Sequence, residues 1–285
     1  MGVQLFYDVQ NSFLLFSFVV FGIILAVTAT AIYSAIVPCG EKFFNNSGTD
    51  TYIGTVAAAF GIVLAFTVTN EWQVFRDIQI LITTEANVLY NMYYTALYLE
   101  NSTEITELIK EYICAIIYVE FPEMELGIIP PDDSNIVRRL IDAVYTYQPD
   151  TAVGNQETLY SQTVTLLNRA IQLRAERIES LSSGLAMEIW WVLIAGYFII
   201  IAMCLLLTGT IESRLLCTSF VSVIYIMLLF LAVALDSPFQ GDFGLEPLAF
   251  IYVKDLIGFT CPDIGPDMYL YQCLKERKKR QGFIH

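Results

Sequence analysis

The chain has 285 residues, of which 56% are hydrophobic and 15% charged, and its formal net charge at pH 7 is −14. Because ordinary soluble proteins carry about 25% charged residues, this composition excludes a typical soluble domain. It indicates a protein whose main partner is the lipid bilayer, and no nucleic-acid partner is predicted for so acidic a chain.

Four stretches lack Asp, Glu, Lys and Arg and are long enough to cross a membrane: 9–40, 51–70, 189–211 and 215–235. A spanning helix needs about 20 mostly apolar residues. The first stretch is too long for the apolar region of a signal peptide and has no basic residues before it, so we predict a tilted or overlong span. The predicted fold class is an all-α integral membrane protein with two transmembrane helical hairpins joined by a cytosolic helical bundle.

The predicted domain organisation follows the four stretches. The first transmembrane helix and an external loop occupy residues 1–50, and the second helix occupies 51–70. A cytosolic helical domain follows at 71–188. The third and fourth helices occupy 189–235, and a cytosolic tail occupies 236–285.

Helical periodicity predicts how the cytosolic domain is built. One helix should run from about 51 to 99, a second from 103 to 119 and a third from 134 to 148, and a fourth should continue from about 155 into the third span. Pro and Gly residues between 121 and 135 should break the domain. The tail should be helical near Leu270, and its basic end is expected to be solvated, with contact to anionic lipid as the alternative.

The basic residues predict the orientation. Two membrane crossings separate the N-terminus from residues 71–188, and two more separate these residues from the C-terminus, so all three lie on the same side. That side holds 13 of the 15 Lys and Arg residues. Basic residues are retained on the cytoplasmic side. We therefore expect a multi-pass protein with cytoplasmic N- and C-termini.

No catalytic pattern is recognisable. The only histidine is His285, the six cysteines include no Cys-x-x-Cys, and no Gly-rich phosphate loop occurs. We expect no enzyme, no cofactor and no disulfide framework. The many carboxylates are expected to form a solvated acidic surface.

Two sets of residues recur at helical spacing in the second span. A small-residue set, typical of close contact between membrane helices, contains Gly54, Ala57, Ala58, Gly61 and Ala65. An adjacent set contains Thr51, Thr55, Ile62, Phe66 and Thr69. The second set could pack within one subunit. Alternatively, it lines a pore in which Ile62 and Phe66 form an apolar constriction.

Glu85 lies among apolar residues, which predicts that its carboxylate is partly buried. A buried carboxylate needs a partner. The antiparallel helix that leads into the third span offers Arg174 and Arg177, so we predict an ion pair with one of them, in a structural role.

The fourth span ends in Leu235-Asp236-Ser237-Pro238-Phe239-Gln240-Gly241-Asp242. Pro238 cannot continue a helix and Gly241 permits a turn, so the segment predicts a helix stop. The alternative is a weak cation site formed by Asp236, Asp242 and Glu246, because calcium binds such oxygen ligands.

Three segments resemble signatures of the bestrophin-like family of four-span membrane proteins, a domain family of unknown function. They are the run from Trp72 to Tyr94, the run Ser183-Gly184 with Trp190-Trp191-Val192-Leu193, and the motif containing Asp236, Pro238, Phe239 and Gly241, followed by 247–250. The resemblance covers roughly residues 56–250. It implies distant kinship to bestrophins, which are oligomeric anion channels with an axial pore.

We therefore expect a homo-oligomeric, channel-like protein that conducts ions passively through an axial pore lined by the second span. Kinship favours anions, whereas an acidic vestibule would gather cations. The alternative is a non-conducting scaffold or accessory subunit that docks another membrane-complex subunit through its acidic cytosolic domain.

Overall fold

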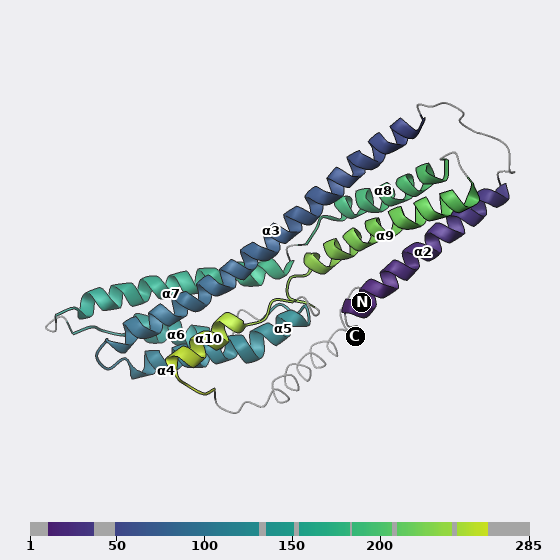
Figure 1. The fold of residues 1–285 in the computed structure, drawn as a ribbon. Coiled ribbons are helices and arrows are strands. Elements are labelled where there is room, and N and C mark those ends of the chain that lie inside the picture. Colours follow the sequence, from purple (N-terminus) through teal and green to yellow (C-terminus); the bar gives the residue numbers. More distant parts are fainter. Residues whose placement is uncertain are drawn as a thin grey trace, which may run out of the picture. The chain divides into compact units, whose positions relative to one another are not determined.

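A computed structural model describes residues 11–36, 49–130, 135–150, 154–182, 184–206, 210–240 and 244–261. All regular structure in these ranges is helical (Figure 1), so the all-α fold class is confirmed. Four helical stretches are long and apolar enough to cross a membrane. The chain divides into two compact units: Met1–Arg76 with Ser183–Phe243 (unit 1), and Asp77–Ser182 with Gly244–His285 (unit 2).

Unit 1 contains α2 (Asn11–Ile36), the first part of α3 (Thr49–Leu97), α8 (Met187–Leu206) and α9 (Ile211–Asp236). These helices lie in the order α3, α8, α9, α2, with α9 packed on both α8 and α2 (Figure 1). α8 and α9 pack on each other, but α2 packs on α9, so the arrangement of two hairpins predicted from the sequence is not confirmed.

Two glycines explain this order, since each allows a neighbouring helix to approach closely. A Cβ atom added to Gly22 of α2 would lie 2.8 Å from Cδ1 of Ile226 in α9. A Cβ atom added to Gly196 of α8 would lie 2.6 Å from Cδ1 of Phe60 in α3. In a bilayer, helices associate through such close packing because lipid tails remove the hydrophobic drive between them.

Hydroxyl groups add hydrogen bonds between the same helices. The Tyr197 hydroxyl of α8 and Oγ of Ser222 in α9 are 2.6 Å apart, and Oγ of Ser222 donates to the Gly22 carbonyl oxygen at 2.9 Å. The Tyr225 hydroxyl donates to the Leu193 carbonyl oxygen at 2.9 Å. Polar side chains that face lipid would lack partners, so these bonds fix the rotation of each helix.

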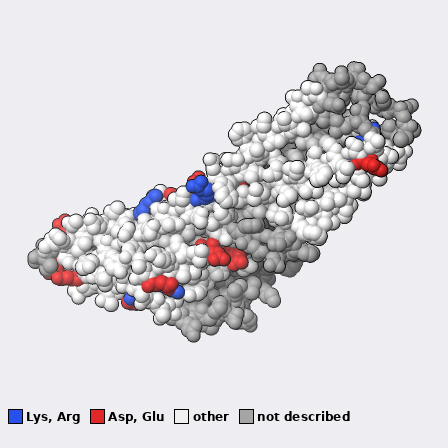
Figure 2. Space-filling model, in the orientation of Figure 1, with Lys and Arg blue, Asp and Glu red and all other residues white. Residues whose placement is uncertain are grey.

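Unit 2 contains the rest of α3 and all the shorter helices. They are α4 (Thr103–Ala115), a π-helical turn (Ile116–Glu120), α5 (Phe121–Glu125), α6 (Asn135–Thr146), α7 (Gln156–Glu179), a 3-10 turn (Ser180–Ser182) and α10 (Leu248–Ile257). On the face drawn in Figure 2, charged side chains gather over this unit, whereas the helices of unit 1 present a nearly uncharged surface except at one end.

The boundaries of α3 agree closely with the predicted helix, but two other boundaries do not. The chain continues from α4 through the π-helical turn into α5 and stays helical past Pro122 to Glu125, instead of breaking at Phe121. The helix predicted to run without interruption from about 155 into the third span ends at Glu179, and α8 begins only at Met187. The predicted helix near Leu270 lies outside the described residues.

A disulfide joins Cys114 of α4 to Cys261, which follows α10, with a Cα–Cα distance of 5.8 Å. No disulfide framework was expected from the sequence, and this single bond was not anticipated. The two cysteines are 147 residues apart, so only the fold brings them together. Gly258, at φ 79°, ends α10 in the left-handed conformation and turns the chain towards α4.

Candidate functional site: the second span and a buried charge cluster

The second span, which is the first part of α3, has one face packed on its own chain. Leu64 is buried at 1% exposure, and Phe60 and Val68 pack against the same apolar cluster. At about 100° per residue, the centre of the predicted pore set lies roughly 160° from this packed face, and the small-residue set lies about midway between them. The span thus has three distinct faces.

The predicted pore set faces outward in the single chain. Ile62 and Phe66 are 57% and 72% exposed, and the three threonines of the set are also exposed. Thr55 donates its hydroxyl hydrogen to the Thr51 carbonyl oxygen at 2.9 Å, and Thr69 donates to Ala65 at 2.8 Å. Because the hydrogens are used within the helix, the oxygen lone pairs remain available to a polar neighbour.

The small-residue set is also uncovered. A Cβ atom added to Gly54 or Gly61 would meet no atom within 4 Å among the described residues. Ala58 and Ala65 are exposed and Ala57 is half-buried. The described part of the chain therefore supplies no helix that packs against this face.

The close contacts within unit 1 depend instead on Gly22 and Gly196, which the sequence reasoning missed. Each is a glycine inside an apolar span, the same signal that singled out Gly54 and Gly61. Sequence spacing marks such positions but does not say which of them faces a helix of the same chain.

A cluster of buried charges lies inside unit 2. Nε of Arg177 donates to Oε2 of Glu85 at 2.7 Å, and its Nη2 donates to Oε1 at 3.1 Å. Both side chains are fully buried. Glu85 thus lies beside Arg177, one of the two arginines predicted to pair with it.

Arg174, the other predicted partner, binds a carboxylate that the sequence reasoning missed. Its Nε donates to Oε1 of Glu120 at 2.8 Å, and Nη2 of Arg177 donates to Oε2 of the same residue at 2.5 Å. Glu120 stands between Val119 and Phe121 in an apolar run, the same signal that drew attention to Glu85. The π-helical turn that holds it changes the helical register, which sequence periodicity could not anticipate.

Aromatic rings enclose the cluster. The Arg177 guanidinium lies 5.4 Å from the ring centre of Phe121 and 5.9 Å from that of Phe250 in α10.

Burial alone would raise the pKa of Glu120, but the charges of Arg177 and Arg174 outweigh it and lower that pKa.

The cluster thus contains two carboxylates and two guanidiniums that neutralise one another. The hydrogen bonds described above link α3, α7 and the π-helical turn. Such a balanced set is suited to holding helices in register rather than to reaction chemistry.

Two of the family-like segments meet in unit 1. Oδ1 of Asp236, at the end of α9, accepts a hydrogen bond from the Leu185 backbone N–H at 2.5 Å. A Cβ atom added to Gly184 would lie 3.4 Å from the same oxygen. Asp236 therefore ties the end of α9 to the segment that enters α8.

The rest of the Asp236 motif is partly described. Pro238 and Phe239 are buried, whereas Gly241 and Asp242 lie outside the described residues. The proposed cation site of Asp236, Asp242 and Glu246 therefore remains a prediction. Among the residues the structure describes, no group of three or more His, Cys, Asp or Glu side chains could hold a metal ion.

Comparisons with known proteins agree with this architecture. The family profile described as the Bestrophin-like domain matches residues 20–250. No curated protein matches the sequence. A crystal structure described as that of a membrane protein is similar with a TM-score of 0.65 at 10% identity, over 85% of this chain and 99% of that one. At this identity the likeness establishes a shared fold only.

Proposed function

Because the chain belongs to the bestrophin-like family, we propose that it is one subunit of a homo-oligomeric membrane channel that conducts ions passively. The observation that carries the proposal is the pair of uncovered faces on the second span. One face is lined with small residues and the other with hydroxyls and two bulky apolar side chains. In a ring of subunits, the small-residue face would contact a neighbouring copy and the other face would line the pore.

The angular arrangement of the faces supports a ring. In a ring of identical subunits, each pore helix packs on its own subunit, faces the axis with the opposite side, and meets a neighbouring copy with a flank. The packed face containing Leu64, the set containing Phe66 and the set containing Gly61 have this order around α3. Gly61 would then allow a neighbouring copy to approach closely.

Ile62 and Phe66 would form the narrowest part of the pore. An apolar ring opposes ion passage because water leaves it readily, while the oxygens of Thr55 and Thr69 on either side replace part of an ion's hydration shell. We propose anions as the conducted species, as kinship to bestrophins implies. The acidic surface of unit 2 would favour cations wherever it faces the permeation path.

The test is conductance in planar bilayers with the full-length protein. Phe66→Ala and Ile62→Ser should each raise the current, and reversal potentials under a salt gradient should give the sign of the ion. Phe220→Ala is the matched control, because Phe220 is an equally exposed phenylalanine, at 68%, on α9. Its current should equal that of the wild type.

A silent wild type and silent variants, with assembled protein in the bilayer, would favour the alternative. In that case the protein is a non-conducting scaffold, and the acidic surface of unit 2 (Figure 2) is the docking site for a partner with basic residues. Cross-linking that captures a basic partner on unit 2 would then replace conductance as the measurement.

We also propose that both termini and unit 2 face the cytoplasm, from the 13 of 15 Lys and Arg residues on that side. Single cysteines at Ser47 and Asp133, introduced on a cysteine-free background, test the orientation in intact cells. An impermeant maleimide should label Ser47→Cys only. Equal labelling of Asp133→Cys would reverse the assignment.

A further inference from the structure

The disulfide in unit 2 fastens one end of a short helix. Cys261 follows α10 by a few residues and is bonded to Cys114 in α4. Near the other end of α10, Phe250 is fully buried and lies over the Arg177 guanidinium and against Phe121. α10 is thus held by an apolar contact at its beginning and by a covalent bond after its end.

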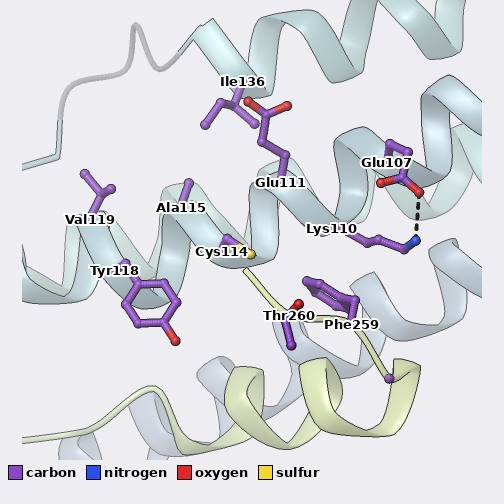
Figure 3. Close-up of a pocket in the computed structure, with 11 residues that line it drawn as sticks. Glu107, Lys110, Glu111, Cys114, Ala115, Tyr118, Val119, Ile136, Phe259 and Thr260 are labelled. Carbon is purple, nitrogen blue, oxygen red and sulfur yellow. Dashed lines mark hydrogen bonds and ion pairs between the residues drawn. The ribbon is translucent and has the colours of Figure 1, made fainter. Parts of the chain in front are cut away.

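A cavity of about 580 Å³ is lined by Cys114, one of the two bonded cysteines (Figure 3). Cys114 lies in its wall, with Lys110 one turn before it on α4, and Phe259 and Thr260, directly before Cys261, line the opposite side. Pockets for small ligands have volumes of about 300 to 1,000 Å³, and this cavity lies within that range. Cys261 is half-buried, whereas Cys114, which lines the cavity, is 4% exposed.

The expected behaviour of this disulfide depends on the redox conditions of the compartment that unit 2 faces. Disulfides are rare in the cytosol, and those that occur there usually respond to redox conditions. In the cytoplasmic orientation proposed above, a disulfide beside an accessible cavity meets millimolar thiols. The inference rests on that orientation. The test below distinguishes an incorrect orientation from a disulfide that does not exchange.

We propose that Cys114–Cys261 is a thiol-exchange site at which small cytosolic thiols such as glutathione release and re-fasten α10. A glutathione thiolate in the cavity attacks Sγ of Cys114, the S–S bond breaks, and Cys261 leaves as a thiolate that takes up a proton. A second glutathione then attacks the sulfur of the bound glutathione, which frees Cys114. The balance is one protein disulfide reduced to two thiols and two glutathiones oxidised to one disulfide. Lys110 in the cavity wall is paired with Glu107 at 2.8 Å, so the exchange rests on access to the sulfur and not on a positive charge beside it.

Reduction should loosen α10 locally rather than unfold unit 2. Phe250 still packs on Phe121 when the covalent bond is open, but the end of α10 after Lys254 loses its attachment. Amide exchange should therefore quicken in α10, while α6 (Asn135–Thr146), which carries no cysteine, serves as the internal reference. The melting temperature of unit 2 should fall by about 5 to 10 °C.

The experiment uses full-length protein in detergent in which Cys39, Cys204, Cys217 and Cys273 are replaced by serine. The ratio of reduced to oxidised glutathione is varied about a thousandfold, and polyethylene-glycol maleimide counts free thiols by gel shift. We expect two thiols to appear together and reversibly across this range. A disulfide that survives the most reducing mixture in the folded protein would overturn the proposal and identify a purely structural bond.

Two variants keep the test specific to the cavity. Cys261→Ser should form a mixed disulfide between Cys114 and glutathione, detected as an adduct by mass spectrometry, and absence of the adduct would contradict the assigned point of attack. Ala115→Phe, which fills the cavity, should slow exchange about tenfold without changing the equilibrium oxidised fraction. Unchanged kinetics would show that the thiol enters elsewhere and would overturn the role of the cavity.

Failure of the orientation gives a different result. If unit 2 faces outward, Cys114 and Cys261 of the otherwise cysteine-free protein stay oxidised in intact cells under all growth conditions, yet exchange with glutathione after purification. If the exchange proposal fails, purified protein does not exchange, whichever way unit 2 faces.

Discussion

The two units of this protein are stabilised in different ways. Unit 1 relies on glycines that let helices touch and on a few hydroxyl hydrogen bonds, as at Gly196 and Ser222. Unit 2 has an apolar core, a disulfide and a buried charge cluster around Arg177. The difference reflects the surroundings. Lipid offers no hydrophobic drive between helices, so close packing determines which helices associate in unit 1. In unit 2, burial of apolar side chains from water provides enough stabilisation to tolerate buried ions.

The largest effect should come from removing the centre of the charge cluster. Arg177→Met leaves Glu85 and Glu120 buried with one arginine between them, and such an unpaired buried charge costs about 3 to 5 kcal/mol. Thermal unfolding followed by fluorescence should show a large loss of stability in unit 2, and limited proteolysis should cut α7 early.

Arg139→Met is the matched control for this variant. Arg139 also forms an ion pair, with Glu111 at 3.1 Å, but the two side chains are 57% and 43% exposed. Exposed pairs contribute about 0 to 1 kcal/mol. Equal losses in the two variants would mean that burial of the Arg177 cluster contributes little.

The next largest effect should come from overfilling unit 1. Gly196→Ala places a methyl group 2.6 Å from the Phe60 ring, and overpacking of this kind costs about 1 to 3 kcal/mol. Gly54→Ala is the control, because a Cβ there meets no atom of the described chain. Melting temperatures of the two variants in detergent should separate clearly.

Gly61→Leu tests whether the small-residue set is needed for folding of the subunit or for assembly of the oligomer. The single chain has room for the side chain, so the subunit should fold. If Gly61 contacts a neighbouring copy, size-exclusion chromatography with light scattering should show smaller oligomers. Normal oligomer size would remove the small-residue set from the subunit interface.

A smaller difference is expected within the charge cluster. Glu85→Gln leaves both arginines in contact with Glu120, whereas Glu120→Gln removes the charge that accepts hydrogen bonds from both Arg174 and Arg177. Hydrogen bonds to charged groups contribute about 1.5 to 3 kcal/mol, so Glu120→Gln should cost about 1 to 2 kcal/mol more. Urea unfolding at pH 7 measures the difference, and a larger loss for Glu85→Gln would reverse the ranking.

Much of this organisation could be predicted from local sequence. The 49-residue length of α3 follows from the absence of glycine and proline after Gly61 and from continuous helical periodicity. An arginine beside Glu85 follows from the cost of burying a carboxylate. Both depend on residues near each other along the chain or on one general rule.

The features that could not be predicted depend on distant pairings. Three features require knowledge of which helices are neighbours: the bond between Cys114 and Cys261, which are 147 residues apart, the contact of α2 with α9, and the pairing of Glu120 with Arg174. Asp236 is intermediate: its motif predicts a helix stop, but its bond to the Leu185 N–H needs the fold.

The smallest effect should come from the hydroxyl bonds of unit 1. Ser222→Ala removes the partner of the Tyr197 hydroxyl and the donor to the Gly22 carbonyl oxygen. Hydrogen bonds between membrane helices average about 0.6 kcal/mol, so the loss should be near 1 kcal/mol for the two bonds. Ser34→Ala is the control, because among the described residues Ser34 bonds within its own helix, to the Ala31 carbonyl oxygen. A melting temperature for Ser222→Ala as low as that of Gly196→Ala would show that polar bonds, rather than close packing at glycine, hold unit 1 together.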